Sequence, residues 1–172
     1  MRLVLVTGGA GFIGSHIVDA LLARGDRVRV VDDLSTGARE NMAGFEDRID
    51  FIEGDIADPA VATRAVNGAD GVFHEAAIPS VPRSIEDPVG TMRANVVGTV
   101  TLLEAARTAR VRRVVFASSS SVYGDSVTLP KHEAMEIRPL SPYAASKLAG
   151  EAYARAYAAS MGLETVALRY FN

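Results

Sequence analysis

Short apolar runs alternate along this chain with longer stretches of helical spacing, and this alternation restricts the possible folds more than any other feature. The apolar runs predict strands at residues 3–6, 28–31, 49–52, 71–74, 113–117 and 165–168. Helical spacing and capping signals predict helices at 12–24, 58–66, 88–108 and 141–161. Such an alternation favours a parallel sheet with helices on both faces. We therefore predict an α/β fold, a doubly wound Rossmann sheet of about six strands, in one domain over residues 1–172.

Three irregular stretches, at residues 33–48, 75–87 and 119–140, each follow the carboxyl end of a predicted strand. Doubly wound sheets bind their ligands at this edge. We therefore look for functional residues in and around these stretches. His74 ends one of the strands, and we expect it to be a structural histidine whose ring nitrogens are hydrogen-bonded.

Composition excludes several classes of protein. The net charge of −3 leaves no basic field that would attract nucleic acid or an anionic membrane. The absence of cysteine excludes a disulfide scaffold, a thiolate zinc site and a cysteine nucleophile, and we expect no metal site. No run of 18 apolar residues is present, and the apolar start is too short for a signal peptide. We therefore expect a cytoplasmic protein without a nucleic-acid or membrane partner.

Three glycines, Gly8, Gly11 and Gly14, lie between the first predicted strand and the first helix. They allow a tight turn and a close approach of the backbone to a pyrophosphate, which the helix N-terminus attracts. Asp32 lies 18 residues after Gly14 at the end of the next strand, where a carboxylate binds the ribose hydroxyls of NAD and repels the 2′-phosphate of NADP. Asp33 is a second candidate, although its position favours a solvated loop residue. The alternative to this NAD site is an ordinary glycine-rich turn.

Tyr143 and Lys147 are four residues apart near the start of the last predicted helix, so they share one face. A nearby ammonium group lowers the pKa of a phenol, and an oxidised nicotinamide ring would do the same. The strand at 113–117 ends in Ser118–Ser121, whose hydroxyls reach the same sheet edge. These residues predict an acid–base site. The alternative is a core tyrosine beside a solvated lysine, followed by a plain serine loop.

The chain carries further motifs in a fixed order: Thr7–Gly14, Gly54-Asp55-Ile56, His74-Glu75-Ala76-Ala77, Ser118-Ser119-x-x-Val122-Tyr123-Gly124, Tyr143-x-x-x-Lys147 and Leu168–Asn172. Together they resemble the extended short-chain dehydrogenases/reductases of the NAD-dependent epimerase/dehydratase family, over the whole chain. The resemblance is strongest to the UDP-glucose and UDP-N-acetylglucosamine 4-epimerase group. That group continues well beyond the last motif, so the resemblance implies that a C-terminal substrate-binding domain is missing.

The resemblance implies a role for each matching residue. Ser119, Tyr143 and Lys147 would be catalytic. The cofactor would contact Gly8, Gly11, Phe12, Ile13, Gly14, Asp32, Asp33, Asp55, Ile56, Ala76, Ala77, Tyr143, Lys147 and Phe171. The substrate would contact Ser80, Ser119, Ser120, Tyr143 and Asn172. Asn95 would be structural, and Glu75 departs from the apolar residue that is commoner at its position.

The implied activity is nucleotide-sugar 4-epimerisation by transient oxidation at C4 with bound NAD, on a UDP-sugar of galactose metabolism. A homodimer would form through helices near 91–108 and 142–160, although their apolar faces could equally pack on the sheet. A 4,6-dehydratase would carry Asp and Glu at the positions of Ser120 and Ser121, and a decarboxylase Glu at the second. Both enzymes remain alternatives, as does a non-catalytic NAD-binding module. We expect the isolated chain to bind NAD with little activity.

Overall fold

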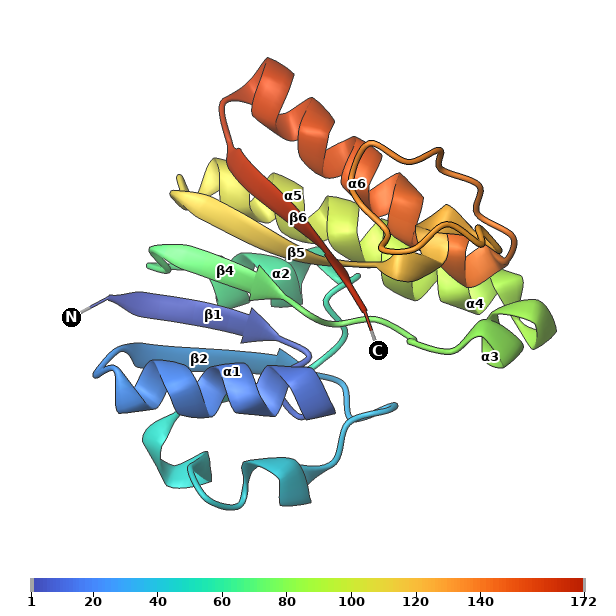
Figure 1. Ribbon diagram of the computed structural model, residues 1–172. Helices are drawn as coiled ribbons and strands as arrows, with labels where there is room; N and C mark the ends of the chain where they lie inside the picture. Colours follow the sequence, from blue (N-terminus) through green and yellow to red (C-terminus); the bar gives the residue numbers. More distant parts are fainter. Residues whose placement is uncertain (1, 172) are drawn as a thin grey trace.

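A six-stranded parallel sheet forms the centre of the computed structural model, which describes residues 2–171. Its strand order is β3-β2-β1-β4-β5-β6, and every neighbouring pair is parallel (Figure 1). The strands are β1 (Leu3–Thr7), β2 (Arg27–Asp32), β3 (Asp50–Glu53), β4 (Gly71–His74), β5 (Arg113–Ser119) and β6 (Glu164–Tyr170). This order confirms the predicted doubly wound Rossmann sheet.

Helices cover both faces of the sheet. They are α1 (Phe12–Ala23), α2 (Pro59–Val66), α3 (Val81–Glu86), α4 (Pro88–Met92), α5 (Gly98–Thr108) and α6 (Pro142–Met161). Short 3₁₀ turns lie at η1 (Arg39–Met42), η2 (Glu46–Arg48) and η4 (Ser120–Tyr123), and η3 (Arg93–Val97) is π-helical. One apolar core joins the sheet to α1 and η1, and a second joins the other face to α2, α5 and the end of α6.

Capping side chains explain where several helices begin. Asp58, Ser80, Asp87 and Ser141 each accept a hydrogen bond from a backbone N–H in the first turn of the helix that follows. Each of these helices has proline in its first turn, where the missing N–H costs nothing. The starts predicted from Asp58-Pro59 and Ser141-Pro142 are therefore confirmed.

One prediction about the middle of the chain was wrong. Residues 75–87 were expected to be irregular, but α3 occupies Val81–Glu86, because Ser80 caps a helix too short to show a periodic apolar pattern. The long helix expected at 88–108 is present, but its middle segment, η3, is π-helical. A π-helical turn adds one residue per turn, which an apolar pattern of 3.6-residue period does not reveal.

The register of the sheet brings residues far apart in the chain to one edge. Thr7 at the end of β1 lies opposite His74 at the end of β4. Ser119 at the end of β5 lies opposite Tyr170 at the end of β6. Since all strands are parallel, these carboxyl ends line a single crevice. Within residues 2–171, no helix is both long enough and apolar enough to cross a membrane.

Candidate active site

A cavity of about 810 Å³ runs along the carboxyl edge of the sheet. It crosses the boundary between β1 and β4, where the strand order reverses and doubly wound sheets bind their ligands. Predicted site residues that line it are Gly8, Gly11, Phe12, Ile13, Gly14, Asp32, Asp33, Asp55, Ile56, Ala76, Ala77, Ser119, Ser120, Tyr143, Lys147 and Phe171. The fold therefore brings together residues from all three predicted irregular stretches. The glycine turn after β1 and Phe171, which follows β6, lie in the same cavity wall.

The loop between β1 and α1 has the shape that a pyrophosphate requires. Gly8 has φ +69°, and a Cβ there would lie 2.6 Å from the backbone nitrogen of Ala76. A Cβ on Gly14 would overlap the carbonyl oxygen of Gly8. Gly11 precedes α1 without a side-chain cap, which leaves the first N–H groups of the helix available. These features fit an anionic group at the N-terminus of α1.

Two carboxylates follow β2 at this end of the cavity. Asp32 is buried, and its oxygens accept hydrogen bonds from the backbone N–H groups of Ala10 and Leu34, each at 2.9 Å. Burial raises the pKa of Asp32, and these two hydrogen bonds oppose the rise. Asp33 is exposed and accepts hydrogen bonds from the backbone and hydroxyl of Ser35. Both acids face the cavity where the ribose of a dinucleotide is expected.

The residues after β3 lie beside these acids. Asp55 accepts hydrogen bonds from the Arg93 guanidinium and, at 2.8 Å, from the Ala57 N–H. Burial alone would raise the pKa of Asp55, but the bonds from Arg93 and Ala57 outweigh it and lower the pKa. Ile56 is buried against the same end of the cavity. Asp55 and Ile56 thus form one wall at this end of the cavity.

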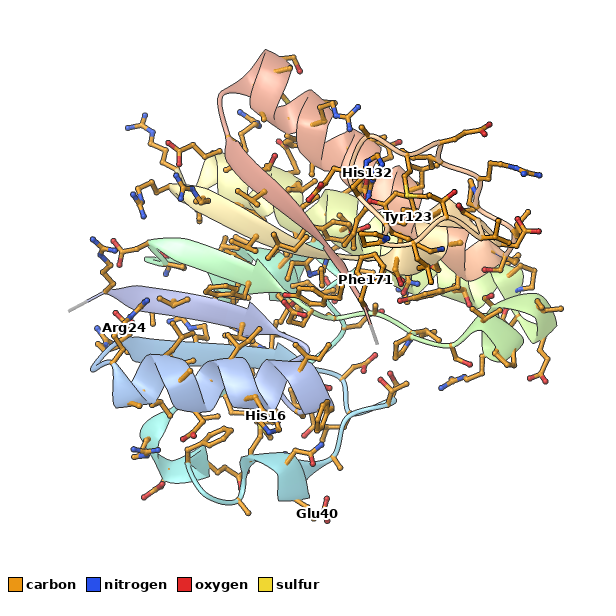
Figure 2. All side chains as sticks on the ribbon, in the orientation of Figure 1. His16, Arg24, Glu40, Tyr123, His132 and Phe171 are labelled. Carbon is orange, nitrogen blue, oxygen red and sulfur yellow. The ribbon has the colours of Figure 1, made fainter. Side chains whose placement is uncertain are left out.

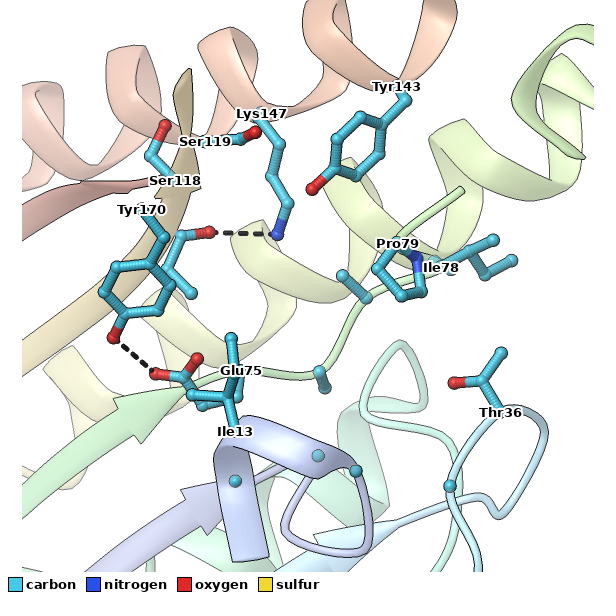
Figure 3. A pocket seen from close by; sticks show the side chains of 18 of the residues that line it. Ile13, Thr36, Glu75, Ile78, Pro79, Ser118, Ser119, Tyr143, Lys147 and Tyr170 are labelled. Carbon is cyan, nitrogen blue, oxygen red and sulfur yellow. Dashed lines mark hydrogen bonds between the residues drawn. The ribbon is translucent and has the colours of Figure 1, made fainter. Parts of the chain in front are cut away.

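Tyr143 and Lys147 lie on one face of α6, as their spacing predicted (Figure 3). The ammonium nitrogen of Lys147 lies 5.9 Å from the centre of the Tyr143 ring and donates a hydrogen bond of 2.9 Å to the carbonyl of Ala117. Lys147 is only 4% exposed. Burial lowers the pKa of Lys147 to about 8, and the charge of Glu75 opposes this shift. The lysine therefore remains largely protonated at neutral pH.

The pKa of Tyr143 shifts in the direction opposite to the one expected from Lys147. Burial raises the pKa of the Tyr143 phenol, and the nearby Ser119 hydroxyl opposes that rise. In the chain without a cofactor, burial therefore outweighs the expected lowering. A basic phenolate requires a further positive charge close by, which agrees with the expectation that an oxidised nicotinamide contributes one.

The four serines at the end of β5 and the start of η4 all line the cavity, but their hydroxyls differ in what they bind. The Ser118 hydroxyl donates a 2.5 Å hydrogen bond to Glu151 on α6. Ser119 Oγ accepts a hydrogen bond from the backbone N–H of Ser121. The Ser121 hydroxyl oxygen is buried and has no hydrogen-bond partner. This part of the cavity therefore offers hydroxyl groups rather than carboxylates at positions 120 and 121.

One predicted substrate residue, Ser80, is not in the cavity wall, and a second, Asn172, cannot be placed. The Ser80 hydroxyl accepts a hydrogen bond from the Arg83 N–H and caps α3, so its position does not support a substrate contact. Asn172 lies outside the described residues. Phe171 lines the cavity with its ring 6.3 Å from that of Tyr123, and both are labelled in Figure 2.

His74 forms the centre of a buried chain of hydrogen bonds. The Thr99 hydroxyl donates to the Asn95 carbonyl at 2.6 Å, so it must accept from His74 Nε2, 2.9 Å away. His74 Nδ1 then accepts from the Thr7 hydroxyl at 2.7 Å, and Thr7 accepts from the Ala76 N–H. Burial, with a smaller effect from the Lys147 charge, lowers the pKa of His74 to about 3. His74 is thus a neutral structural histidine, as predicted, and it positions Ala76.

Asn95 connects the segment after β4 to the helix that carries Tyr143. Its side chain accepts a hydrogen bond from the Ile78 N–H at 2.8 Å and donates one to the Ser146 hydroxyl at 2.9 Å. Ser146 in turn donates to the Tyr143 carbonyl at 2.7 Å. This arrangement agrees with the structural role expected for Asn95.

Sequence reasoning missed a pair of residues in the cavity wall. The Tyr170 hydroxyl donates a 3.2 Å hydrogen bond to the Glu75 carboxylate, and both side chains line the cavity (Figure 3). Burial raises the pKa of Tyr170 to about 12, and the Glu75 charge adds to that rise. The available signal was Glu75 itself. It directly follows a strand, at a position where the family that the chain resembles usually has an apolar residue.

Replacing Gly14 with alanine tests the close approach in this loop. The added Cβ would overlap backbone atoms of Gly8, so the loop must move, which we expect to cost about 1–3 kcal/mol of stability. Movement of the loop should also weaken NAD binding by on the order of tenfold or more. Calorimetric NAD titration and urea unfolding of the complete gene product measure both effects. Gly44→Ala is the control, because its Cβ would meet nothing within 4 Å; equal NAD affinity in the two variants would contradict the interpretation.

Comparison with known proteins places this geometry in context. A UDP-glucose 4-epimerase from Mycolicibacterium smegmatis is 50% identical over 157 residues, covering 89% of this chain and 50% of that protein. The structure of a UDP-N-acetylglucosamine 4-epimerase from Methanobrevibacter ruminantium M1, in complex with UDP-N-acetylmuramic acid, is 41% identical with a TM-score of 0.94. The match covers 99% of this chain and 55% of the chain of that epimerase.

A dTDP-glucose 4,6-dehydratase from Streptomyces venezuelae, solved with NAD bound, is also similar. It is 42% identical with a TM-score of 0.93, and the match covers 98% of this chain and 55% of the dehydratase. The chain therefore spans about half the length of these proteins. Residues 4–172 also match the profile of the NAD dependent epimerase/dehydratase family. From this match, we conclude that the chain belongs to that family, whose cofactor is NAD.

Proposed function

We propose that this chain supplies the cofactor-binding and catalytic part of a nucleotide-sugar 4-epimerase. The proposed substrates are UDP-glucose and UDP-galactose, or their N-acetyl forms. One observation carries the proposal: Tyr143, Lys147 and Ser119 meet in the cavity wall, next to hydroxyl groups at Ser120 and Ser121. Such a site can remove and return a proton at a sugar hydroxyl but has no acid pair for a further elimination.

In this proposal, Tyr143 is the proton acceptor for the sugar 4-hydroxyl, and Ser119 orients that hydroxyl or relays its proton. NAD held in this site would supply the hydride acceptor, and then the hydride donor, for sugar C4. Inversion at C4 would require the 4-keto sugar to turn its other face toward the cofactor between the two transfers. Lys147 keeps a positive charge beside the phenol and binds the nicotinamide ribose. The glycine loop and Asp32 hold the pyrophosphate and the adenosine ribose. No net oxidation results.

A 4,6-dehydratase is the second candidate, because a dTDP-glucose 4,6-dehydratase of known structure is 42% identical to this chain. Elimination of water from the sugar requires an acid and a base in addition to the tyrosine. Ser120 and Ser121 occupy the positions where the resemblance would require Asp and Glu. A decarboxylase would require Glu at the position of Ser121, so this chain lacks that residue as well. The intact set of Tyr143, Lys147 and Ser119 argues against a non-catalytic NAD-binding module.

Product identification distinguishes these functions. The complete gene product is incubated with UDP-, dTDP- and GDP-sugars, and the products are identified by NMR. We expect the 4-epimer of a UDP-hexose and no other product. A 4-keto-6-deoxy sugar as the sole product would show a dehydratase. Bound NAD without conversion of any sugar would indicate the non-catalytic module.

We further propose that the sugar and nucleotide are held mainly by the part of the relatives that this chain does not span. The 172-residue chain by itself is then expected to bind NAD with little turnover, because it lacks groups that position the sugar and exclude water. Robust conversion of UDP-sugars by the 172-residue chain would contradict this.

The assembly and location are also proposals. Ile85, Val89 and Met92 are exposed apolar residues on α3 and α4, beside α6, and they suit a homodimer contact. We propose a cytoplasmic homodimer that acts in galactose metabolism. Light scattering on the complete gene product tests the oligomeric state, and a monomer at micromolar concentration would contradict the dimer.

A further inference from the structure

Glu75 places a carboxylate in the wall of the cavity directly after β4. Its side chain is half-buried, and the Tyr170 hydroxyl on β6 donates a 3.2 Å hydrogen bond to it. Gly8 allows the backbone of Glu75 to approach the glycine loop, since a Cβ on Gly8 would lie 2.9 Å from the Glu75 carbonyl carbon. The backbone of Glu75 is therefore packed against the glycine loop, and its carboxylate is held by the Tyr170 hydroxyl.

The acids of the cavity wall divide between its two ends, and the cations Lys131 and Lys147 also line the wall. Asp32 and Asp33 follow β2, and Asp55 is paired with Arg93, so these charges lie where the adenosine half of a dinucleotide is expected. With its pyrophosphate at α1, a dinucleotide must place its other half toward β4, β5 and β6. At that end of the cavity, both Glu75 and the buried Lys147 line the wall (Figure 3).

Glu75 and Lys147 influence each other's charge. Burial raises the pKa of Glu75, while the Tyr170 hydrogen bond and the Lys147 charge oppose the rise. Burial lowers the pKa of Lys147, and Glu75 opposes that shift. An ammonium group and an oxidised nicotinamide would place two positive charges in one partly dry site, where their repulsion is weakly screened.

We propose that Glu75, held in place by Tyr170, is a positioning residue that favours the oxidised form of the bound nicotinamide over the reduced form. The oxidised ring is a cation and the reduced ring is neutral, so a fixed carboxylate attracts only the former. The same charge offsets that of Lys147. This inference rests on the cofactor site of the proposed function, but it does not depend on which sugar is converted.

Cofactor affinities measured without any sugar test this role. The dissociation constants for NAD⁺ and NADH are determined for the complete gene product and its Glu75→Gln variant. We expect the ratio of the NAD⁺ constant to the NADH constant to rise on the order of tenfold in the variant. For a two-electron couple, that ratio corresponds to a midpoint potential about 30 mV more positive for the bound cofactor. A rise below threefold would overturn the proposal.

Three further variants isolate the charge of Glu75. Glu75→Asp keeps the charge and should keep the ratio within threefold of the wild type. Asp33→Asn removes a charge at the adenosine end of the cavity. The adenosine half is identical in NAD⁺ and NADH, so the affinities for both forms should change by the same factor. A shift of the ratio in Asp33→Asn would show a general effect of net charge and overturn the local role. If Glu75→Gln melts at a lower temperature than the wild type, Glu75→Leu takes its place, because a leucine side chain has no polar group that needs a hydrogen-bond partner.

The two proposals fail in different ways. If the sugar panel yields no 4-epimer, the proposed function fails, while the NAD⁺ to NADH ratio still decides the role of Glu75. If the 4-epimer forms and the ratio in Glu75→Gln equals that of the wild type, the function stands and the inference about Glu75 is wrong.

Discussion

Tyr143→Phe is expected to lower the turnover of a UDP-hexose by the complete gene product by about 10²–10⁴-fold, the usual contribution of a proton-transfer group. The variant loses only the hydroxyl that removes and returns the proton. The phenyl ring remains beside Lys147, whose ammonium lies 5.9 Å from its centre. NAD affinity should therefore stay within about threefold of the wild type. Initial-rate kinetics and NAD titration of the same preparation measure both quantities.

Tyr153→Phe is the matched control, because it removes a hydroxyl from the same helix at a side chain that is 44% exposed and does not line the cavity. Its turnover should equal that of the wild type. A Tyr143→Phe variant that retained full turnover would remove Tyr143 from the mechanism. A parallel loss of NAD affinity would show that the hydroxyl acts in binding.

Much of the fold could be predicted because its signals are local. The apolar runs that became β1 to β6 are continuous, as buried parallel strands require, and they lie between helices of clear periodicity. Asp58 and Ser141 cap their helices through contacts within three residues. Such features depend on residues that are close in sequence, so they can be predicted without the tertiary structure.

The features that could not be predicted depend on short or irregular elements. The helix α3 has only six residues, too few to show a hydrophobic repeat. The π-helical turn at η3 follows from packing, since its buried Asn95 is bonded to Ile78 and Ser146 from two other parts of the chain. Neither contact leaves a trace in the local sequence.

The candidate site shows the same division. The glycine loop, Asp32 and the pair Tyr143–Lys147 form recognisable motifs because their members are close in sequence. The contact between Glu75 and Tyr170 joins residues 95 positions apart and depends on the pairing of β4 with β5 and of β5 with β6. Motif reasoning treated Glu75 as a departure, whereas the fold gives it a hydrogen-bond donor and a place in the cavity.

Glu151→Ala is expected to destabilise the complete gene product by about 3–5 kcal/mol, because it breaks one side of a buried ion pair. Arg169 on β6 donates two hydrogen bonds of 2.8 Å to the Glu151 carboxylate on α6, and Ser118 donates a third. The side chains of Arg169 and Glu151 are 13% and 5% exposed. Without the carboxylate, a largely buried guanidinium is left without a counter-charge. Urea unfolding followed by circular dichroism measures the loss.

Two comparisons separate the buried charge from a general effect of substitution. Glu164→Ala breaks the exposed pair of Glu164 with Arg113, whose side chains are 56% and 47% exposed, and should cost about 1 kcal/mol or less. The double variant Glu151→Leu with Arg169→Met removes both buried charges and should recover at least half of the single variant's loss. A double variant less stable than the single one would show that the pair is not the source.

The effect of Glu151→Ala should also depend on pH. Burial alone would raise the pKa of Glu151, but the hydrogen bonds from Arg169 and Ser118 outweigh it and hold the pKa below the ordinary value of 4.5. The unfolded chain therefore binds this proton more readily than the folded chain. The stability that Glu151 contributes is present above pH 4.5 and is lost as the pH falls through the lower folded pKa. The difference between wild type and Glu151→Ala should shrink over that acid range. A difference that stayed constant would mean that Glu151 stabilises the protein by its shape and not by its charge.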